Sequence, residues 1–292
     1  MLICFRIDGK SMHIKLGQTD PLPMTSVHSG QGFAVLDDVY CLTTQIVNVY
    51  FLGTPGYGNP WVLVDAGLHG AGKHILQTAV WRFGPKNPPQ AIILTHGHFD
   101  HVGALSEITE RWDVPVYAHD REMPYLTGAA DYDGPYPDAG NGLVSTLSRF
   151  FPNAPIDISD RVHPLPEDQP IPGLTGWEWL PTPGHTPGHI SLFRRRDGAL
   201  VAGDAFVTVK QEALYDVLTQ KREVNGPPRY YTSDWKRAKA SVERLYGLKP
   251  AIAMTGHGMP MQGHKLTVQL AHLVASFEEL AMPPRATERG TP

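Results

Sequence analysis

The sequence predicts an α/β fold: a four-layer αββα sandwich in which two mixed β-sheets lie face to face and helices cover their outer sides. Segments with strand-like and helix-like patterns alternate along the chain, which is typical of a layered α/β domain. Side chains with metal-ligand chemistry follow apolar runs in both halves, so the two halves are expected to meet at one site. With 292 residues, 41% of them hydrophobic, the chain can bury the core of a single domain of this size.

The first half begins with a β-meander over residues 32–66, because apolar runs there are separated by turns rich in Gly, Pro and Asn. Its predicted strands are Phe33–Leu36, Tyr40–Thr43, Ile46–Leu52 and Trp61–Val64. Residues 71–83 have the pattern of a helix that Gly84-Pro85 would end. The next predicted elements are a strand over residues 91–95, a helix over residues 102–111 and a strand over residues 114–118.

The second half contains the second sheet and its covering helices. Strands are predicted near Trp177, His189 and Ala199, and another starts at Ala251. The helical patterns extend over residues 233–246 and 265–280.

Two stretches fall outside this plan and divide the chain further. Residues 120–172 and 206–233 are long and irregular, apart from a short helix expected over residues 143–151, and we expect them to act as lids that carry specificity. The alternative is a surface elaboration or a dimer contact. Residues 31–281 would then form one domain, preceded by an extension, residues 1–30, with little periodic signal and followed by a flexible tail, residues 282–292.

The segment Thr95–His101 concentrates four metal-ligand side chains directly after an apolar strand. Imidazole nitrogens and carboxylates suit Zn²⁺, Fe or Mn²⁺. In extended chain, His96, His98 and Asp100 would share one face because side chains alternate. His101 would point the other way unless a helix beginning near Val102 bends the chain. One short segment could therefore serve two metal ions.

Three later segments repeat the plan of an apolar strand followed by a ligand. His185 lies in a Pro- and Gly-rich turn, Asp204 ends the apolar run 199–203, and His257 lies between two glycines after the run 251–254. Turn residues of this kind fix the position of a side chain at a strand end. His189 is expected to pack or hydrogen-bond nearby.

These residues, in this order, resemble the metallo-β-lactamase superfamily, and within it the glyoxalase II and lactonase-like hydrolases. The similarity extends from about Phe33 to Leu280 and includes an Asp-x-Gly element at Asp65. The resemblance implies one metal ion held by His96, His98 and His185 and a second held by Asp100, His101 and His257, with Asp204 bridging them. Asp65 would orient a ligand imidazole. Two divalent ions are implied, Zn first, with Fe or Mn as alternatives.

The implied chemistry is hydrolysis of an ester, thioester or lactone in a small molecule. A water that bridges two divalent cations is acidified toward neutrality, and one cation polarises the substrate carbonyl. Asp204 would space the cations and Asp100 would orient the hydroxide, so both are candidate catalytic residues. Two alternatives stay open: a mononuclear Fe(II) oxygenase of the persulfide dioxygenase type, and a binding module without catalysis on the same fold.

Departures from known subfamilies narrow the substrate by exclusion. Little more than one helix follows His257, whereas glyoxalase II has a C-terminal helical domain. The tyrosine that follows the bridging Asp in familiar lactonases is replaced here by Ala205-Phe206, and β-lactamases of this superfamily lack that Asp. Residues of the insertions, and one beyond His257, are the candidate substrate contacts: Tyr125, Tyr215, Tyr230, Tyr231 and His264.

Composition excludes several other classes of protein. A net charge of −4 argues against a nucleic-acid-binding surface, and no apolar stretch reaches membrane-spanning length. Cys4 and Cys41 make no disulfide framework, so a cytoplasmic location is expected. The basic run Arg194–Arg196 is interpreted as an exposed hairpin turn. A small molecule is the expected partner, and a homodimer is left open.

Overall fold

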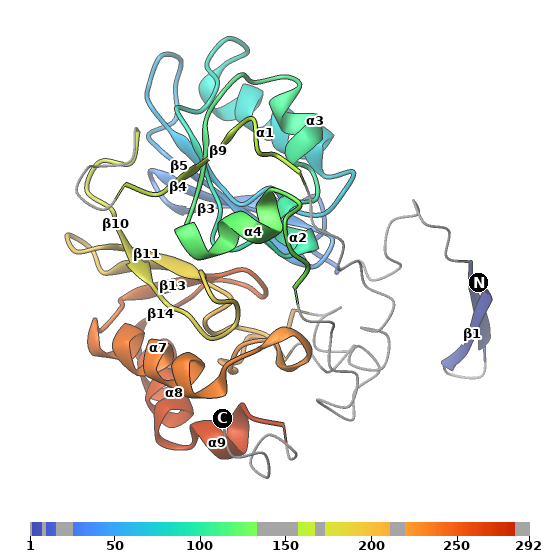
Figure 1. Ribbon diagram of the computed structural model, residues 1–292. Helices are drawn as coiled ribbons and strands as arrows, with labels where there is room; N and C mark the ends of the chain where they lie inside the picture. The colour runs from blue at the N-terminus through green and yellow to red at the C-terminus, as the bar shows by residue number, and fades with distance from the viewer. Residues whose placement is uncertain are drawn as a thin grey trace.

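The computed structural model describes residues 2–7, 10–15, 26–132, 157–166, 173–210 and 220–283. Its two main sheets lie face to face, with α1 and α3 outside one of them and α7 and α8 outside the other (Figure 1). The predicted four-layer sandwich is therefore confirmed. Among the described residues, no helix is both long and apolar enough to cross a membrane.

The first sheet has seven strands in the order β3-β4-β5-β6-β7-β8-β9. Their bounds are Gly32–Leu36, Val39–Thr44, Val47–Leu52, Val62–Val64, Ile92–Ile93, Val116–Ala118 and Val162–Pro164. Strands β3 to β6 form the antiparallel meander that the turn residues predict. Strands β6 to β9 are parallel, so their carboxyl ends lie at one edge of the sheet.

The second sheet has five strands in the order β10-β11-β12-β13-β14. Their bounds are Glu178–Pro181, Ile190–Arg194, Ala199–Gly203, Ile252–Thr255 and Met261–Gln262. β12 and β13 are parallel, so the residues that follow them also emerge at one edge. A backbone hydrogen bond from Ile190 N to Thr95 O, 2.9 Å long, joins this sheet to the loop after β7.

Helices cover the two outer faces and shape the loops at the site. The helices outside the sheets are α1 (Gly72–Phe83), α3 (Leu105–Thr109), α7 (Trp235–Gly247), α8 (Gly263–Ala275) and α9 (Phe277–Leu280). The short helices of the loops are α2 (Phe99–Val102), η1 (Asp120–Glu122), α4 (Met123–Leu126) and η4 (Arg229–Tyr231).

Three buried apolar clusters fill the spaces between the four layers. One lies between the first sheet and α1 and α3, a second lies between the two sheets, and a third lies between the second sheet and α7 and α8. Burial of this apolar surface is the main stabilising term of the fold. The site described below is carried by the loops at the margin of the middle cluster.

Several elements differ from the sequence predictions. The helix expected over residues 102–111 begins earlier, at Phe99, and is divided into α2 and α3. The division falls at Ala104, whose backbone departs from helical angles, next to Gly103, which packs on the backbone of Leu68 and His69. The last helix is divided at Ser276. β9 was not predicted, and neither was the hairpin of β1 (Leu2–Ile7) and β2 (Lys10–Lys15). The helix expected over residues 143–151 lies outside the described residues.

The interpretation of Arg194 as part of an exposed turn is wrong. The turn consists of residues 195–198, whereas Arg194 is the last residue of β11 and is only 2% exposed. Its guanidinium bonds to Asp38 and Asp197 and lies 4.7 Å from the centre of the Trp177 ring. One carboxylate from the adjacent turn and one from a distant turn therefore make its burial favourable, and the local sequence does not reveal the distant partner, Asp38.

Candidate metal centre

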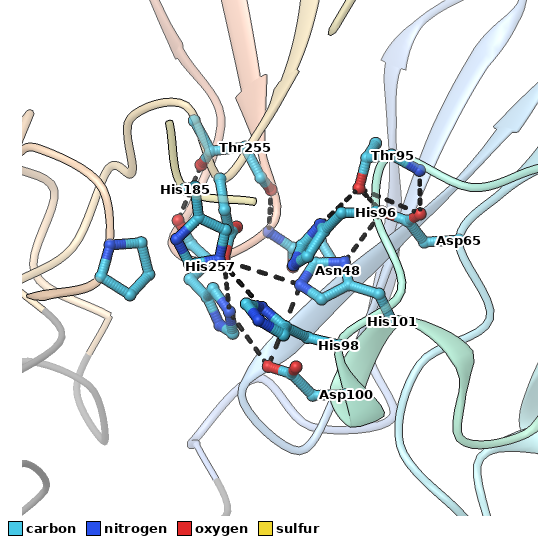
Figure 2. A network of polar contacts seen from close by, with 12 residues as sticks. Asn48, Asp65, Thr95, His96, His98, Asp100, His101, His185, Thr255 and His257 are labelled. Carbon is cyan, nitrogen blue, oxygen red and sulfur yellow. Dashed lines mark hydrogen bonds and ion pairs between the residues drawn. The ribbon is translucent and has the colours of Figure 1, made fainter. Parts of the chain in front are cut away.

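The predicted ligands meet where the carboxyl ends of parallel strands from both sheets face each other (Figure 2). Asp65 directly follows β6, and the segment from His96 to His101 follows β7. Asp204 directly follows β12, and His257 follows β13. Loops at such strand ends are held by a rigid scaffold, which is where binding groups commonly lie.

One group consists of three histidines from two loops. His96, His98 and His185 are buried, and one ring nitrogen of each lies within 4.8 Å of the others. His98 Nδ1 lies 3.0 Å from His185 Nε2. Three imidazoles at this spacing match a protein site for zinc or a similar divalent ion.

A second group adds carboxylates. Asp100, His101 and His257 also place one ligand atom each within 4.8 Å of one another. Asp100 Oδ2 lies 3.2 Å from His257 Nε2 and 3.9 Å from His101 Nε2. Helix α2 turns the chain after His98, so His101 joins Asp100 in this group, as the predicted bend requires.

Asp204 lies between the two groups. Its Oδ2 is 3.3 Å from His257 Nε2, 3.6 Å from His185 Nε2 and 3.7 Å from His101 Nε2. The backbone of Gly256 packs so closely on Asp204 and His101 that a Cβ there would collide with both side chains. Only glycine fits at this position.

Within the described part of the chain, three buried ligand atoms have no hydrogen-bond partner: His96 Nε2, His101 Nε2 and Asp204 Oδ1. Buried polar atoms in native proteins are nearly always paired, because an unpaired one keeps the full cost of losing its water. All three atoms belong to the cluster of His96, His101 and Asp204, whose ligand atoms lie within 4.8 Å of one another. The donor set therefore fits divalent cations.

Hydrogen bonds behind the ligands fix the orientation of the rings. Asp65 Oδ2 lies 2.9 Å from His101 Nδ1, and Thr95 Oγ1 bonds to Asp65 and lies 3.1 Å from His96 Nδ1. His185 Nδ1 is paired with Thr232 Oγ1, and His257 Nδ1 with the carbonyl of Ile46. Such partners select the tautomer that leaves the other ring nitrogen facing a metal ion.

The two groups differ in electrostatics. Burial, reinforced by the neighbouring imidazoles, holds the pKa values of His96 and His185 well below the usual range, and burial lowers the pKa of His98 to about 4. For His257, burial acts in the same direction, but Asp204 and Asp100 outweigh it and raise its pKa to about 10. Asp100, Asp65 and Asp204 likewise raise the pKa of His101 against the effect of burial. The three-histidine group is therefore neutral near pH 7, as metal ligands must be.

His189 lies beside the centre without joining it. Its Nδ1 is 2.8 Å from Thr182 Oγ1, and its Nε2 accepts a hydrogen bond of 2.9 Å from the backbone N–H of Asp204. Burial lowers the pKa of His189 to about 3, so the ring stays neutral and able to accept. The expected hydrogen-bonding role is confirmed, and the bond fixes the backbone that carries Asp204.

Of the predicted substrate contacts, two line a pocket over the metal centre and two others do not. A pocket over the centre is lined by Tyr230 and Tyr231, together with Ile46, Leu68, Phe99 and Pro228. The ring centre of Tyr231 is 4.6 Å from that of His98. Tyr125 stacks on Tyr132 and does not line this pocket, and His264 is exposed in the first turn of α8. Tyr215 lies outside the described residues.

Sequence reasoning missed Glu122 and Tyr132. Glu122 follows β8 at the same sheet edge as Asp65 and is fully buried, and burial raises its pKa. Tyr132 bonds to Glu122, and its ring centre lies 4.6 Å from that of His98. The rule that functional side chains follow apolar strands also applies to Glu122, but the irregular pattern of residues 120–172 favours an insertion there.

Comparisons with known proteins agree with this architecture. The family model of the metallo-β-lactamase superfamily matches residues 42–257. The probable metallo-hydrolase YflN of Bacillus subtilis is 52% identical over 256 residues, which cover 87% of this chain and 97% of YflN. A second protein of that organism, the probable metallo-hydrolase YybB, is 30% identical over 206 residues, covering 68% of this chain and 79% of YybB.

Solved structures show the same fold at low identity. A metallo-β-lactamase family protein from Thermus thermophilus has a TM-score of 0.56 at 20% identity, covering 84% of this chain and 81% of that one. A B3 metallo-β-lactamase with an active-site glutamic acid has a TM-score of 0.58 at 16% identity. The match covers 93% of this chain and 98% of that one. The family match over residues 42–257 and the identity to YflN place the chain in the metallo-β-lactamase superfamily.

Proposed function

We propose that the protein is a dinuclear metal-dependent hydrolase that cleaves an ester, thioester or lactone bond of a small molecule, as glyoxalase II and lactonase-like enzymes do. The observation that supports it most is the convergence of seven ligand side chains, in which three buried ligand atoms lack a hydrogen-bond partner among the described residues. YflN and YybB, both named probable metallo-hydrolases, agree with this class of activity.

His96, His98 and His185 would hold one cation, Asp100, His101 and His257 the other, and Asp204 would contact both. Zn²⁺ is the first choice for such donors, with Fe or Mn²⁺ as alternatives. When bound, two divalent cations supply a water of lowered pKa and polarise a carbonyl oxygen. Asp100 is 13% exposed at its side chain, so it is the carboxylate placed to accept a proton from a molecule entering the pocket.

The wall of the pocket supports an uncharged substrate with an apolar portion. Aliphatic and aromatic side chains surround the ligands, among them Leu68, Phe99 and Tyr230. Burial and the nearby Asp100 raise the pKa of Tyr231, so its hydroxyl stays protonated and can donate a hydrogen bond. We therefore assign Tyr231 to the substrate carbonyl or the leaving-group oxygen.

The test is a rate comparison across matched substrates with the zinc-loaded protein. Aliphatic lactones, acyl thioesters and p-nitrophenyl butyrate should be cleaved, and p-nitrophenyl butyrate faster than the anionic mono-p-nitrophenyl succinate. Tyr231→Phe should lower kcat/KM about tenfold, the value of one lost hydrogen bond near the upper end of its usual range. Absence of cleavage across the whole panel would refute the proposal, and equal rates for the two p-nitrophenyl esters would refute the apolar assignment.

A further inference from the structure

The carboxylate of Glu122 is buried among neutral donors. Oε1 accepts hydrogen bonds from Thr186 Oγ1 at 2.8 Å and from Gly188 N at 2.7 Å. Oε2 accepts one from Gly97 N at 2.9 Å and one from the hydroxyl of Tyr132. Burying a carboxylate among neutral groups is costly, and the four donors offset part of that cost here.

The four donors belong largely to the loops that carry the three-histidine group. Gly97 stands between His96 and His98. Thr186 directly follows His185, and Gly188 lies in the same loop. Oε2 of Glu122 therefore bonds to the His96–His98 loop and Oε1 bonds to the His185 loop, so one carboxylate connects the two loops.

The packing around Gly97 and Gly188 shows how closely the two ligand loops approach the carboxylate of Glu122 and its partner Tyr132. A Cβ at Gly97 would come within 2.5 Å of the Tyr132 hydroxyl oxygen, and a Cβ at Gly188 would come within 2.8 Å of Glu122 Cγ. A larger residue at Gly97 would displace the Tyr132 hydroxyl, and one at Gly188 would also meet the backbone nitrogen of Glu122. Both ligand loops are therefore in close contact with Glu122 and its partner Tyr132.

We propose that Glu122 is a positioning residue that holds the His96–His98 loop and the His185 loop at the spacing one metal ion requires. Two of its four hydrogen bonds reach the ligand loops through the backbone of Gly97 and Gly188, and a third reaches the His185 loop through the hydroxyl of Thr186. Glu122 lies outside the set of residues that line the pocket. The inference rests on the metal centre of the proposed function. It goes further by assigning control of one of the two ion sites to a residue in the first insertion.

Glu122→Gln tests the role because glutamine keeps the volume and removes one acceptor. Its amide nitrogen must face either the Gly97 N–H or the Gly188 N–H, so one loop meets a donor instead of an acceptor. Titration of metal-free protein with Co²⁺, followed by the visible spectrum and by chelator competition, should show one of two ions bound 10- to 100-fold more weakly, the range typical of outer partners. Binding of the other ion should be unchanged, and the amide resonances of Gly97 and Gly188 should shift.

Three variants separate positioning from loss of stability. Glu107→Gln makes the same change where a glutamate accepts from the Gly70 N–H at 2.8 Å, away from the ligand loops, and should bind both ions normally. Ile75→Val changes a buried residue of α1, which lowers stability without altering the contacts of Glu122. This variant should also bind both ions normally. Tyr132→Phe keeps both glycine bonds to Glu122 and should weaken the same ion less.

The outcomes distinguish this inference from the proposed function. A wild-type protein that binds no Co²⁺ refutes the metal centre and, with it, the role of Glu122. A wild-type protein that binds two ions, with a Glu122→Gln variant that binds both unchanged or weakens both equally, overturns only the role of Glu122.

Discussion

Two buried groups of ionisable side chains lie at opposite ends of strand β11. In one group every charged side chain has protein partners, and in the other some ligand atoms have no hydrogen bond among the described residues. At the end of β11, Arg194 makes contacts of 2.7 Å to both Asp38 and Asp197. Just before the start of the strand, His189 bonds to the backbone of Asp204. This bond lies beside the centre where His96, His101 and Asp204 each keep an atom without a hydrogen bond in the described part of the chain. The Arg194 cluster is satisfied by protein alone, whereas the histidine centre has ligand atoms left over. Both groups contain buried charge, so buried charge alone does not identify a binding site. What distinguishes the histidine centre is that, within the residues the structure describes, several of its ligand atoms have no hydrogen bond where the loops meet.

Removing Asp204 should have the largest effect because this carboxylate lies between both groups. Asp204→Ala should lose bound metal and reduce hydrolysis by more than about a hundredfold, beyond what the loss of an outer partner costs. Metal content and kcat/KM measure this. Asp197→Ala, which removes a carboxylate from the complete cluster on the same sheet, should keep metal and rate. An Asp204→Ala protein with normal metal and rate would refute the central role of that residue.

Removing the charge of Asp65 should have a smaller effect on the same centre. Asp65→Asn keeps the shape but weakens the bond to His101, so metal affinity should fall about 10- to 100-fold. Chelator competition on the purified variant measures the change. Asp38→Asn is the matched change in the other cluster, and if it lowers metal affinity as much, the distinction between the clusters is wrong.

Removing Arg194 should affect stability and leave the metal centre unchanged. Arg194→Ala removes the buried partner of Asp38 and Asp197, which keep their contacts to the exposed Arg196. Because both carboxylates are also partly exposed, the free energy of unfolding should fall by about 1–3 kcal/mol. Urea unfolding measures this, with metal content as the control. Loss of metal in this variant at unchanged fold would show that the two clusters are coupled.

The pH dependence of stability should differ only slightly between wild type and Arg194→Ala, and the difference should be confined to acid. Burial alone would raise the pKa values of Asp38 and Asp197, but Arg194, with a smaller contribution from Arg196, outweighs it and lowers both below the ordinary 3.8. The unfolded chain therefore binds more protons in acid, so this stabilisation is full above the unfolded pKa and is lost as pH falls through the folded values. Between about pH 5 and pH 3, metal-free wild type should lose more stability than Arg194→Ala. Parallel curves for the two proteins would contradict this.

The sequence predicted the four layers and the seven candidate ligands because both depend on local signals. Apolar runs define strands, and a ligand after a strand end must emerge at a sheet edge, as Asp204 and His257 do. Glu122 and Arg194 could not be placed this way. Their environments depend on which distant loop packs against them, namely the loops of Gly97 and Gly188 for one and the turn of Asp38 for the other. The ends of helices also differed from the prediction: one helix is interrupted at Ala104, beside the close contact of Gly103 with the loop of Leu68 and His69.

Elemental analysis of protein purified without a metal-binding affinity tag and without chelator decides whether the seven ligands form a dinuclear centre. We expect about two Zn, Fe or Mn per chain, as dinuclear hydrolysis requires, and less metal in Asp204→Ala. One Fe and no other metal would contradict the dinuclear site and favour an oxygenase. No metal, even after incubation with Zn²⁺, would show that these ligands do not form a metal centre.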